Sequence, residues 1–319
     1  LTNFYYWCSS RVLSLDRKYA KTILNYLNKK QAVTDKDRAE IALSYHCLTL
    51  TDVFWVKKQD ETRTFEGISL YRNSLSDAFF DVCLRGVYPT LQNREFLTQG
   101  KVAGDISTSG VAPKAWIRKN GKIYLYKDGD AGEVNAELLA SKIAGCFQCN
   151  HIEYFEDNYL GQKVCACKLI TSEEQSIVPM EFIEVYALNH DTDKYAIVAE
   201  KDSYNYYMMN IVDYLVGNTD RHWGNWGFWV NSDTNELGKL YPLMDFNKSF
   251  TAYDGIEGAN CLTSRTAMTQ KQAAIEAVSK IGLNQIAEIE EEWFYDLKIK
   301  EMFFKRLAVL KSAGKQASR

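Results

Sequence analysis

The sequence contains no long hydrophobic run. Its most apolar stretch, Met208–Val216, is short and is interrupted by Asn210 and Asp213. A helix that crosses a membrane needs roughly 20 predominantly apolar residues, so we expect neither a spanning helix nor a membrane partner. The opening segment Leu1–Cys8 lacks the basic and apolar regions of a secretion signal. We therefore expect the protein to be cytoplasmic.

A large net charge and long runs of like charge are also lacking. The 319 residues include 38 Lys and Arg against 41 Asp and Glu, a formal net charge of -3. Such a chain has no overall basic field that would attract nucleic acid or an anionic membrane. Hydrophobic residues make up 46% and charged residues 25%, as in globular proteins, which excludes disorder over most of the length. The length favours about two domains.

Cysteine is sparse, at eight residues, which excludes a disulfide scaffold, and in the cytoplasm these thiols would stay reduced. One group has spacings that could bind zinc: Cys146, Cys149, His151, Cys165 and Cys167. We favour a structural role for the last two cysteines. They lie two residues apart in a predicted strand, so they would pack as small apolar side chains on one face.

The first 95 residues are predicted to form a helical extension. Apolar residues recur at helical spacing in Tyr19–Leu27 and Ala39–Leu48, and Thr34 or Asp35 can cap the second helix. A third helix, Ser76–Arg85, begins with a serine cap and is followed by glycine. The first two helices have the spacing of a helix-turn-helix, but so do many helical pairs. We therefore do not expect direct DNA binding.

Strands are predicted after residue 100. Lys114–Lys119 and Lys122–Lys127 alternate around an Asn-Gly pair, the strongest short-range signal for a β-hairpin. Alternation places Lys127 on the same face as the apolar Ile123. A buried ammonium is costly unless an anion meets it, and the alternative is a frayed strand end from which the lysine reaches water.

The next predicted helix, Glu133–Ala144, offers a carboxylate for that lysine. It ends before a glycine, and Glu137 lies near Val134 and Leu138 rather than on the polar side. Lys127 and Glu137 could therefore form an internal ion pair.

The segment before the hairpin, Gly104–Lys114, is rich in Gly, Ser and Thr. Such a segment can offer backbone N–H groups, hydroxyls and a lysine to phosphate oxygens. It matches neither of the common glycine-rich phosphate motifs, so an ordinary loop remains the alternative.

Three polar residues later in the chain could carry chemistry. Asp220 and Asn225 follow a predicted helix, Ser203–Val216, and Asp245 follows a predicted hairpin. Because a hairpin returns its two ends to neighbouring positions, Asn225 and Asp245 should meet at its open end. Their oxygens, with Asp220 nearby, suit Mg²⁺. Each of these residues alone could be a turn former, but turn formation explains the presence of all three poorly.

The remaining predicted elements complete this region. The hairpin between Asn225 and Asp245 has strands Trp226–Val230 and Leu240–Met244. Three helical stretches follow it, and their bounds are Met268–Ile281, Gln285–Phe294 and Lys298–Ala313.

The run Gly217–His222, with Asn225, resembles the catalytic loop of the HipA-like bacterial serine/threonine kinases, which include the CtkA-type kinases. This resemblance implies that Asp220 is the catalytic base and that Asn225 and Asp245 bind Mg²⁺. It covers residues 100 to 250. The two residues after Asp245 do not include the glycine found there in ordinary kinases.

The resemblance also implies an ATP site. Lys127 resembles the nucleotide-binding lysine of the family, and Glu137 the helix glutamate that orients it. The backbone around Lys168 and Ile170 is the expected adenine contact. The segment Ser107–Lys114 resembles the phosphate loop, from which we select Ser107, Thr108, Ser109, Gly110 and Lys114. Phosphorylation of Ser107 by the kinase itself would place about two negative charges where ATP phosphates must sit.

We therefore expect a two-lobed α+β fold of the protein-kinase type. Residues 1–95 form the helical extension, 96–172 a β-rich small lobe with the phosphate loop, and 173–319 a mainly helical large lobe with the catalytic loop and metal site. The expected activity is ATP- and Mg²⁺-dependent phosphorylation of serine or threonine in a protein substrate. From the resemblance alone, we expect a toxin with an antitoxin-like protein partner.

Two alternatives stay open. One is a small-molecule or lipid phosphotransferase on the same fold, because fold and metal site do not identify the acceptor. The other is a non-catalytic protein that binds ATP or DNA.

Overall fold

A computed structural model of the chain describes residues 2–29, 31–32, 34–87, 105, 107–108 and 110–317. Ser109 and the expected domain boundary at residue 95 lie outside the described residues. The chain divides into two compact units, each built from two stretches of sequence. Unit 1 comprises Leu1–Gly129 and Glu156–Ser176, and unit 2 comprises Asp130–Phe155 and Ile177–Arg319.

Unit 1 begins with short helices. Their bounds are α1 (Thr2–Ser9), α2 (Ala20–Tyr26), α3 (Asp35–Leu43), α4 (Phe65–Ile68) and α5 (Asp77–Arg85). The cap of α3 is Thr34, whose hydroxyl accepts a hydrogen bond from the Asp37 N–H in a capping box. The expected extension of this helix to Leu48 is wrong, because His46 and Cys47 have left-handed backbone conformations that a helix cannot contain.

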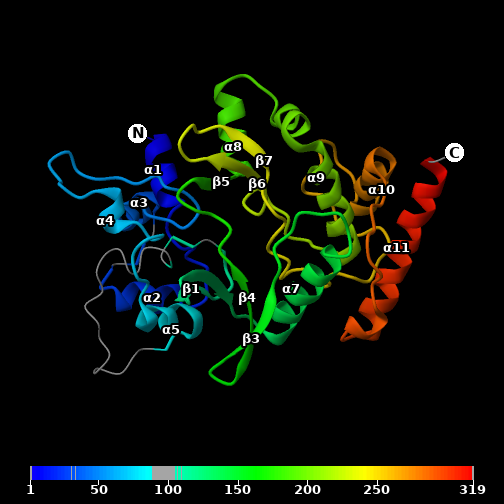
Figure 1. Cartoon of the computed structure of the whole chain (residues 1–319), viewed down its shortest axis with the longest axis horizontal. Helices are drawn as coiled ribbons and strands as arrows, with labels where there is room; N and C mark the ends of the chain where they lie inside the picture. Colours follow the sequence, from blue (N-terminus) through cyan, green and yellow to red (C-terminus); the bar gives the residue numbers. More distant parts are fainter. Residues whose placement is uncertain are drawn as a thin grey trace. The chain divides into compact units, whose positions relative to one another are not determined.

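A four-stranded sheet completes unit 1. Its strands are β1 (Lys114–Lys119), β2 (Lys122–Lys127), β3 (Phe155–Tyr159) and β4 (Gln162–Lys168), in the order β1-β2-β4-β3. The predicted β1–β2 hairpin is confirmed, and Asn120 and Gly121 both have positive φ. Helix α5 packs against β1, and α2 packs against α5 (Figure 1). The helices and the sheet share one hydrophobic core.

Unit 2 is mainly helical. Its helices are α7 (Ala131–Ala144), α8 (Met180–Asn189), α9 (Lys194–Val216), α10 (Gln270–Ile281) and α11 (Leu297–Ala317). A small sheet has the order β5-β6-β7, with bounds Gln175–Pro179, Gly227–Asn231 and Leu237–Leu240. The last strand begins earlier than expected, because Val230 pairs directly with Leu237 and so shortens the turn.

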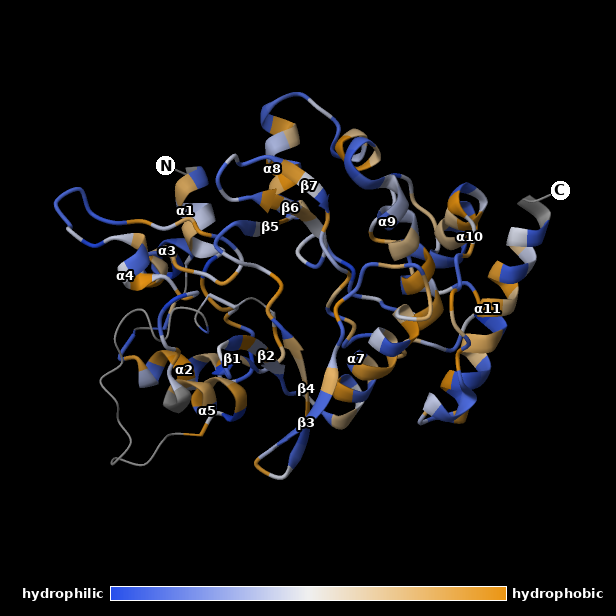
Figure 2. Cartoon of the chain, viewed as in Figure 1, coloured by the Kyte–Doolittle hydropathy of each residue, from blue (hydrophilic) through white to orange (hydrophobic). Residues whose placement is uncertain are grey.

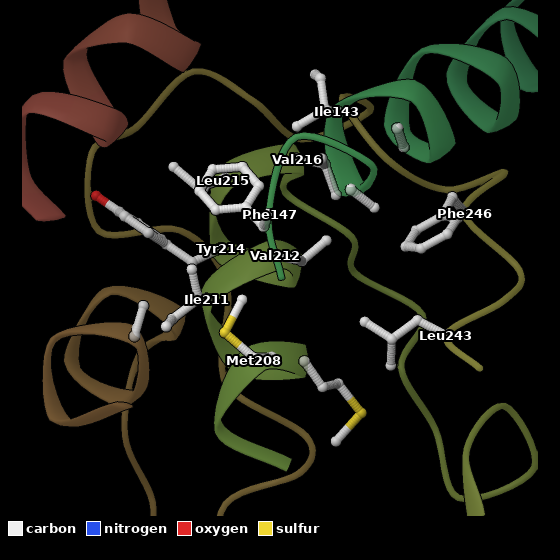
Figure 3. Packing of buried hydrophobic residues seen from close by; sticks show 14 of the residues in the cluster. Ile143, Phe147, Met208, Ile211, Val212, Tyr214, Leu215, Val216, Leu243 and Phe246 are labelled. Atoms are coloured by element: carbon white, nitrogen blue, oxygen red, sulfur yellow. The ribbon is translucent and has the colours of Figure 1, made fainter. Parts of the chain in front are cut away.

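The core of unit 2 surrounds α9. Figure 3 shows Met208, Val212 and Val216 of α9 packed among residues from other segments, including Ile143 of α7 and Phe246. Helices α10 and α11 also pack against α9. Figure 2 shows that α11 alternates hydrophobic and hydrophilic residues along its length, as expected for a helix with one buried face.

Two sequence predictions for the C-terminal region have different outcomes. Thr269 caps α10 through a capping box, as expected. The expected helix over Gln285–Phe294 is wrong, because only Glu291–Trp293 form a short 3₁₀ turn. Asn284 has a positive φ of 51°, and residues 285–290 are not helical. No helix in the described part of the chain is both long and apolar enough to cross a membrane.

Candidate active site

The loop that carries Asp220 begins where α9 ends, at Gly217. This glycine has a φ of 61°, and a Cβ there would collide with the Tyr253 ring, so the position favours glycine. The last carbonyls of α9 all accept hydrogen bonds, as helix ends require. The donors are Asn218 N to Asp213 O (3.0 Å), Arg306 Nη1 to Tyr214 O (2.7 Å), Tyr253 Oη to Leu215 O, and Phe250 N to Val216 O (2.9 Å).

A buried ion pair holds the loop from within. Arg221 donates from Nε and Nη2 to the two carboxylate oxygens of Asp213 on α9, at 2.9 and 3.0 Å. Its Nη1 donates to Asn225 O (2.9 Å) and Met244 O (2.6 Å). Burial lowers the pKa of Arg221, but Asp213 outweighs it and holds the pKa above its usual value. One guanidinium therefore joins α9, the loop and the residue before Asp245.

Side-chain amides connect the three predicted catalytic and metal residues. Asn218 Oδ1 accepts from Asp220 N (3.1 Å), and Asn218 Nδ2 donates to Asp245 O (3.3 Å). Asn225 Nδ2 donates to Asp220 O (2.9 Å), so the amide oxygen of Asn225 is the atom suited to a cation. The structure thus brings Asp220, Asn225 and Asp245 into one hydrogen-bonded network. Asn218 was missed by the sequence analysis, although it lies in the motif.

Helix α7 binds the segment that follows Asp245. The buried carboxylate of Glu137 accepts a hydrogen bond from Phe246 N at 2.8 Å. One turn earlier, Glu133 forms an ion pair with Lys248. Glu137 was selected as the partner of Lys127, which belongs to unit 1, and that ion pair stays a prediction. What the structure adds is a direct contact between Glu137 and the residue that follows Asp245.

In unit 1, two of the predicted ATP-binding lysines lie opposite each other. Lys114 of β1 pairs with Lys127 of β2, and each is 6% exposed. Cross-strand partners share one face of the sheet. A Cβ at Gly110 would lie 2.5 Å from Lys114 Nζ, so this ammonium reaches back over the loop. The two lysines therefore lie on one face of the hairpin, and their role in ATP binding stays a prediction.

Arg17, from the N-terminal region, holds that loop. Its guanidinium donates to Asp105 O (3.1 Å), Thr108 O (3.2 Å) and Lys114 O. Trp116 also binds the loop, through its N–H to Asp105 Oδ1 (2.7 Å) and its indole N–H to Thr108 Oγ1 (2.8 Å). Sequence analysis missed Arg17, because its partners lie about 90 residues further along the chain and no motif marks it.

The other predicted nucleotide contacts lie at the end of β4. Lys168 pairs with Tyr124 of β2, and the N–H of the next residue donates to Ile123 O at 2.9 Å. Ile170 follows, half-buried. The backbone here is therefore attached to β2, and its role as the adenine contact stays a prediction. Ser107 is half-buried and described, whereas Ser109 is not.

The residues that could hold a metal are few. Within the described residues, no three His, Cys, Asp or Glu side chains meet in a group that could bind an ion. Cys165 and Cys167 are buried on β4 in unit 1, whereas Cys149 and His151 belong to unit 2. Asp245 and Asn225 offer a carboxylate and an amide oxygen, hard ligands of the kind that Mg²⁺ takes together with phosphate oxygens.

Comparison with known proteins bears on the fold. No protein-family model matches this sequence, and no curated protein does. Among solved structures, the chain is similar to the Helicobacter pylori proinflammatory kinase CtkA, with a TM-score of 0.52 and 16% identity. The match covers 66% of this chain and 92% of that chain. The fold is kinase-like.

This likeness confirms the predicted combination of helices and strands in a kinase-like fold. The kinase found is of the type that the Asp220 loop resembles in sequence. The division into a small and a large lobe, the ATP and Mg²⁺ requirement and the residue roles belong to the proposal that follows.

Proposed function

We propose that this protein is an ATP- and Mg²⁺-dependent kinase that phosphorylates serine or threonine in a protein substrate. The observation that carries the proposal is the hydrogen-bonded network of Asp220, Asn225 and Asp245. Phosphoryl transfer needs a base for the attacking hydroxyl and ligands for a metal that bridges phosphate oxygens. In this proposal Asp220 is the base and Asn225 and Asp245 are the metal ligands, and a kinase-like fold supports the assignment.

The chemistry follows from these positions. The oxygen of the substrate hydroxyl forms a bond to the γ-phosphorus as the bond from that phosphorus to the bridging oxygen breaks. The electron pair leaves with ADP, and the hydroxyl proton passes to the Asp220 carboxylate. Asn225 and Asp245 would hold Mg²⁺, which supplies positive charge to the phosphate oxygens when bound.

Unit 1 contains the lysines that we propose to bind ATP. Lys114 and Lys127 are paired across β1 and β2, and their ammonium groups neutralise the phosphate chain. Arg17 binds the backbone carbonyls of Asp105 and Thr108 in the segment before β1. Lys114 Nζ lies against Gly110 of the segment before β1, and this position supports a role in binding phosphate.

The test is phosphate transfer from Mg-ATP by the full chain, read by intact mass and by labelled phosphate on added protein. Asp220→Asn and Asp245→Ala should each abolish transfer while the chain stays folded. Asp233→Asn is the matched control, because it makes the same Asp-to-Asn change in the exposed turn after β6. It should transfer phosphate at the rate of the parent protein. Peptide mapping of the parent would show whether Ser107 carries the phosphate.

Other outcomes would move the assignment. Transfer by Asp220→Asn at the parental rate would contradict the base role. Label that enters a metabolite or lipid extract, with none on protein, would favour a small-molecule phosphotransferase. If Mg-ATP does not bind at all and the protein binds DNA in a salt-dependent way, the non-catalytic alternative gains support. An antitoxin-like partner, proposed from the family resemblance, should relieve growth arrest when the two proteins are expressed together.

A further inference from the structure

Lys248 lies in a short strap, residues 245–250, whose two ends are attached to Asn218 of the catalytic loop and to Val216 at the end of α9. Asp245 O accepts from Asn218 Nδ2 at 3.3 Å, and Phe250 N donates to Val216 O at 2.9 Å. Between these ends, Ser249 N donates to Phe246 O at 2.9 Å and closes a turn. The strap therefore keeps Lys248 beside the loop that carries Asp220.

The ammonium of Lys248 is held among carboxylates. It forms an ion pair with Glu133 in the first turn of α7, and Lys248 is 43% and Glu133 24% exposed in their side chains. The hydrogen bond to Glu133 raises the pKa of Lys248 against the effect of burial, and the charges of Asp220 and Asp130 raise it further. The field of Asp220 thus reaches this lysine, which stays charged at neutral pH.

The ion pair with Glu133 can be exchanged. Partly exposed ion pairs contribute about 0–1 kcal/mol, because water screens them and ordering two side chains costs entropy. A phosphoryl group with several anionic oxygens is a stronger partner for an ammonium than one carboxylate. The free protein therefore keeps Lys248 charged, beside the loop that carries Asp220 and able to turn to a new anion.

The basic residues of the catalytic loop are committed elsewhere. Arg221 is buried, and its guanidinium binds Asp213 and two backbone carbonyls. His222 turns back on its own loop, where its Nδ1 accepts from Gly224 N at 3.0 Å. Of the two cations Arg221 and Lys248, Arg221 is 2% exposed, and Lys248 is the one whose charged group solvent reaches.

We propose that Lys248 is a catalytic residue whose ammonium leaves Glu133 and donates hydrogen bonds to the oxygens of the phosphoryl group during transfer. This inference rests on the proposed kinase function. The reaction balances as described for Asp220: the hydroxyl proton goes to that carboxylate, the electron pair leaves with ADP, and Lys248 keeps its proton. Its role is to neutralise charge on the transferring group, which is the main work of a phosphotransferase site.

The test compares four variants with the parent protein. Lys248→Met removes the charge and keeps the stem, Lys248→Arg keeps the charge, and Glu133→Gln removes only the resting partner. Lys271→Met is the matched control, because Lys271 forms a similar partly exposed ion pair with Glu257. Each variant is measured for ATP affinity, for the rate of one turnover at saturating Mg-ATP, and for its urea midpoint.

Lys248→Met should lose transfer by about 10²–10³-fold, as when one donor to a developing charge is removed, with ATP affinity within about threefold of the parent. Lys248→Arg should recover most of the rate. Glu133→Gln and Lys271→Met should transfer at rates close to the parent, and all four should unfold at similar urea concentrations.

Two results would overturn the inference while the kinase function stands. One is a Lys248→Met protein that transfers within about threefold of the parent. The other is an equal loss in Lys248→Met and Glu133→Gln, which would mean that the ion pair only supports the structure. A parent protein that binds Mg-ATP but transfers no phosphate would overturn both the inference and the proposed function.

Discussion

Arg306 provides the sharpest test of how the start of the Asp220 loop is held. It lies on α11, is fully buried, and donates to Tyr214 O (2.7 Å) and Gly255 O (2.6 Å). Its guanidinium lies 4.2 Å from the centre of the Tyr253 ring, a favourable cation–π geometry. Burial lowers the pKa of Arg306, so the fold bears a desolvation cost in order to keep these contacts.

Replacing Arg306 with Met keeps much of the aliphatic stem and removes the guanidinium. Two hydrogen bonds from a charged donor contribute roughly 1.5–3 kcal/mol each, about 3–6 kcal/mol together. Removing the charge also removes the desolvation cost of the buried guanidinium, and this offsets part of the lost hydrogen-bond stabilisation. We therefore expect the free energy of unfolding of unit 2 to fall by about 2–4 kcal/mol.

The assay is urea unfolding followed by tryptophan fluorescence, with hydrogen exchange of peptides from the end of α9. Exchange should accelerate around Tyr214 and the loop after it, because a carbonyl loses its donor. Lys305→Met, at the exposed neighbouring position, is the control and should change stability by less than about 0.5 kcal/mol. If Arg306→Met proves as stable as Lys305→Met, the assigned role of this arginine is wrong.

Two further predictions concern the loop in unit 1. Burial raises the pKa of Asp105 from 3.8 to about 7, so between these pH values the folded state keeps a proton that the unfolded chain loses, and stability falls as pH rises. The stability of Asp105→Asn should fall less than that of the parent protein as the pH rises. If the urea midpoints of the parent and of Asp105→Asn change in parallel between about pH 5 and about pH 8, the prediction is wrong. Arg17→Met should weaken ATP binding by about tenfold, equivalent to about one hydrogen bond. The rate of phosphate transfer by Arg17→Met at saturating ATP should change less than its ATP affinity. Lys21→Met, at an exposed position, is the control, and equal ATP affinities of the two variants would refute the role of Arg17.

Local interactions made several features predictable from the sequence. The Asn-Gly pair forms the β1–β2 turn with φ values of 51° and 75°, because only such residues adopt left-handed conformations cheaply. Thr34 and Thr269 cap their helices through contacts three residues away. The residue pattern around Asp220, Asn225 and Asp245 was enough to select them as candidates, since the order of polar residues along a loop and hairpin is visible in the sequence.

Long-range packing decided the rest. Glu137 meets Phe246, and Arg306 meets Tyr214, across 109 and 92 residues, and no sequence spacing encodes such pairs. Long-range contacts also explain why the predicted helix over Gln285–Phe294 does not form. Gln148 N donates to Asn284 O and Ile286 N donates to Cys146 O, and these hydrogen bonds hold the segment in a non-helical form. The sequence by itself therefore determined the turns, the caps and the chemical types at the candidate site. Only the tertiary structure decided which distant side chains hold that site in place, because these contacts depend on how the helices pack.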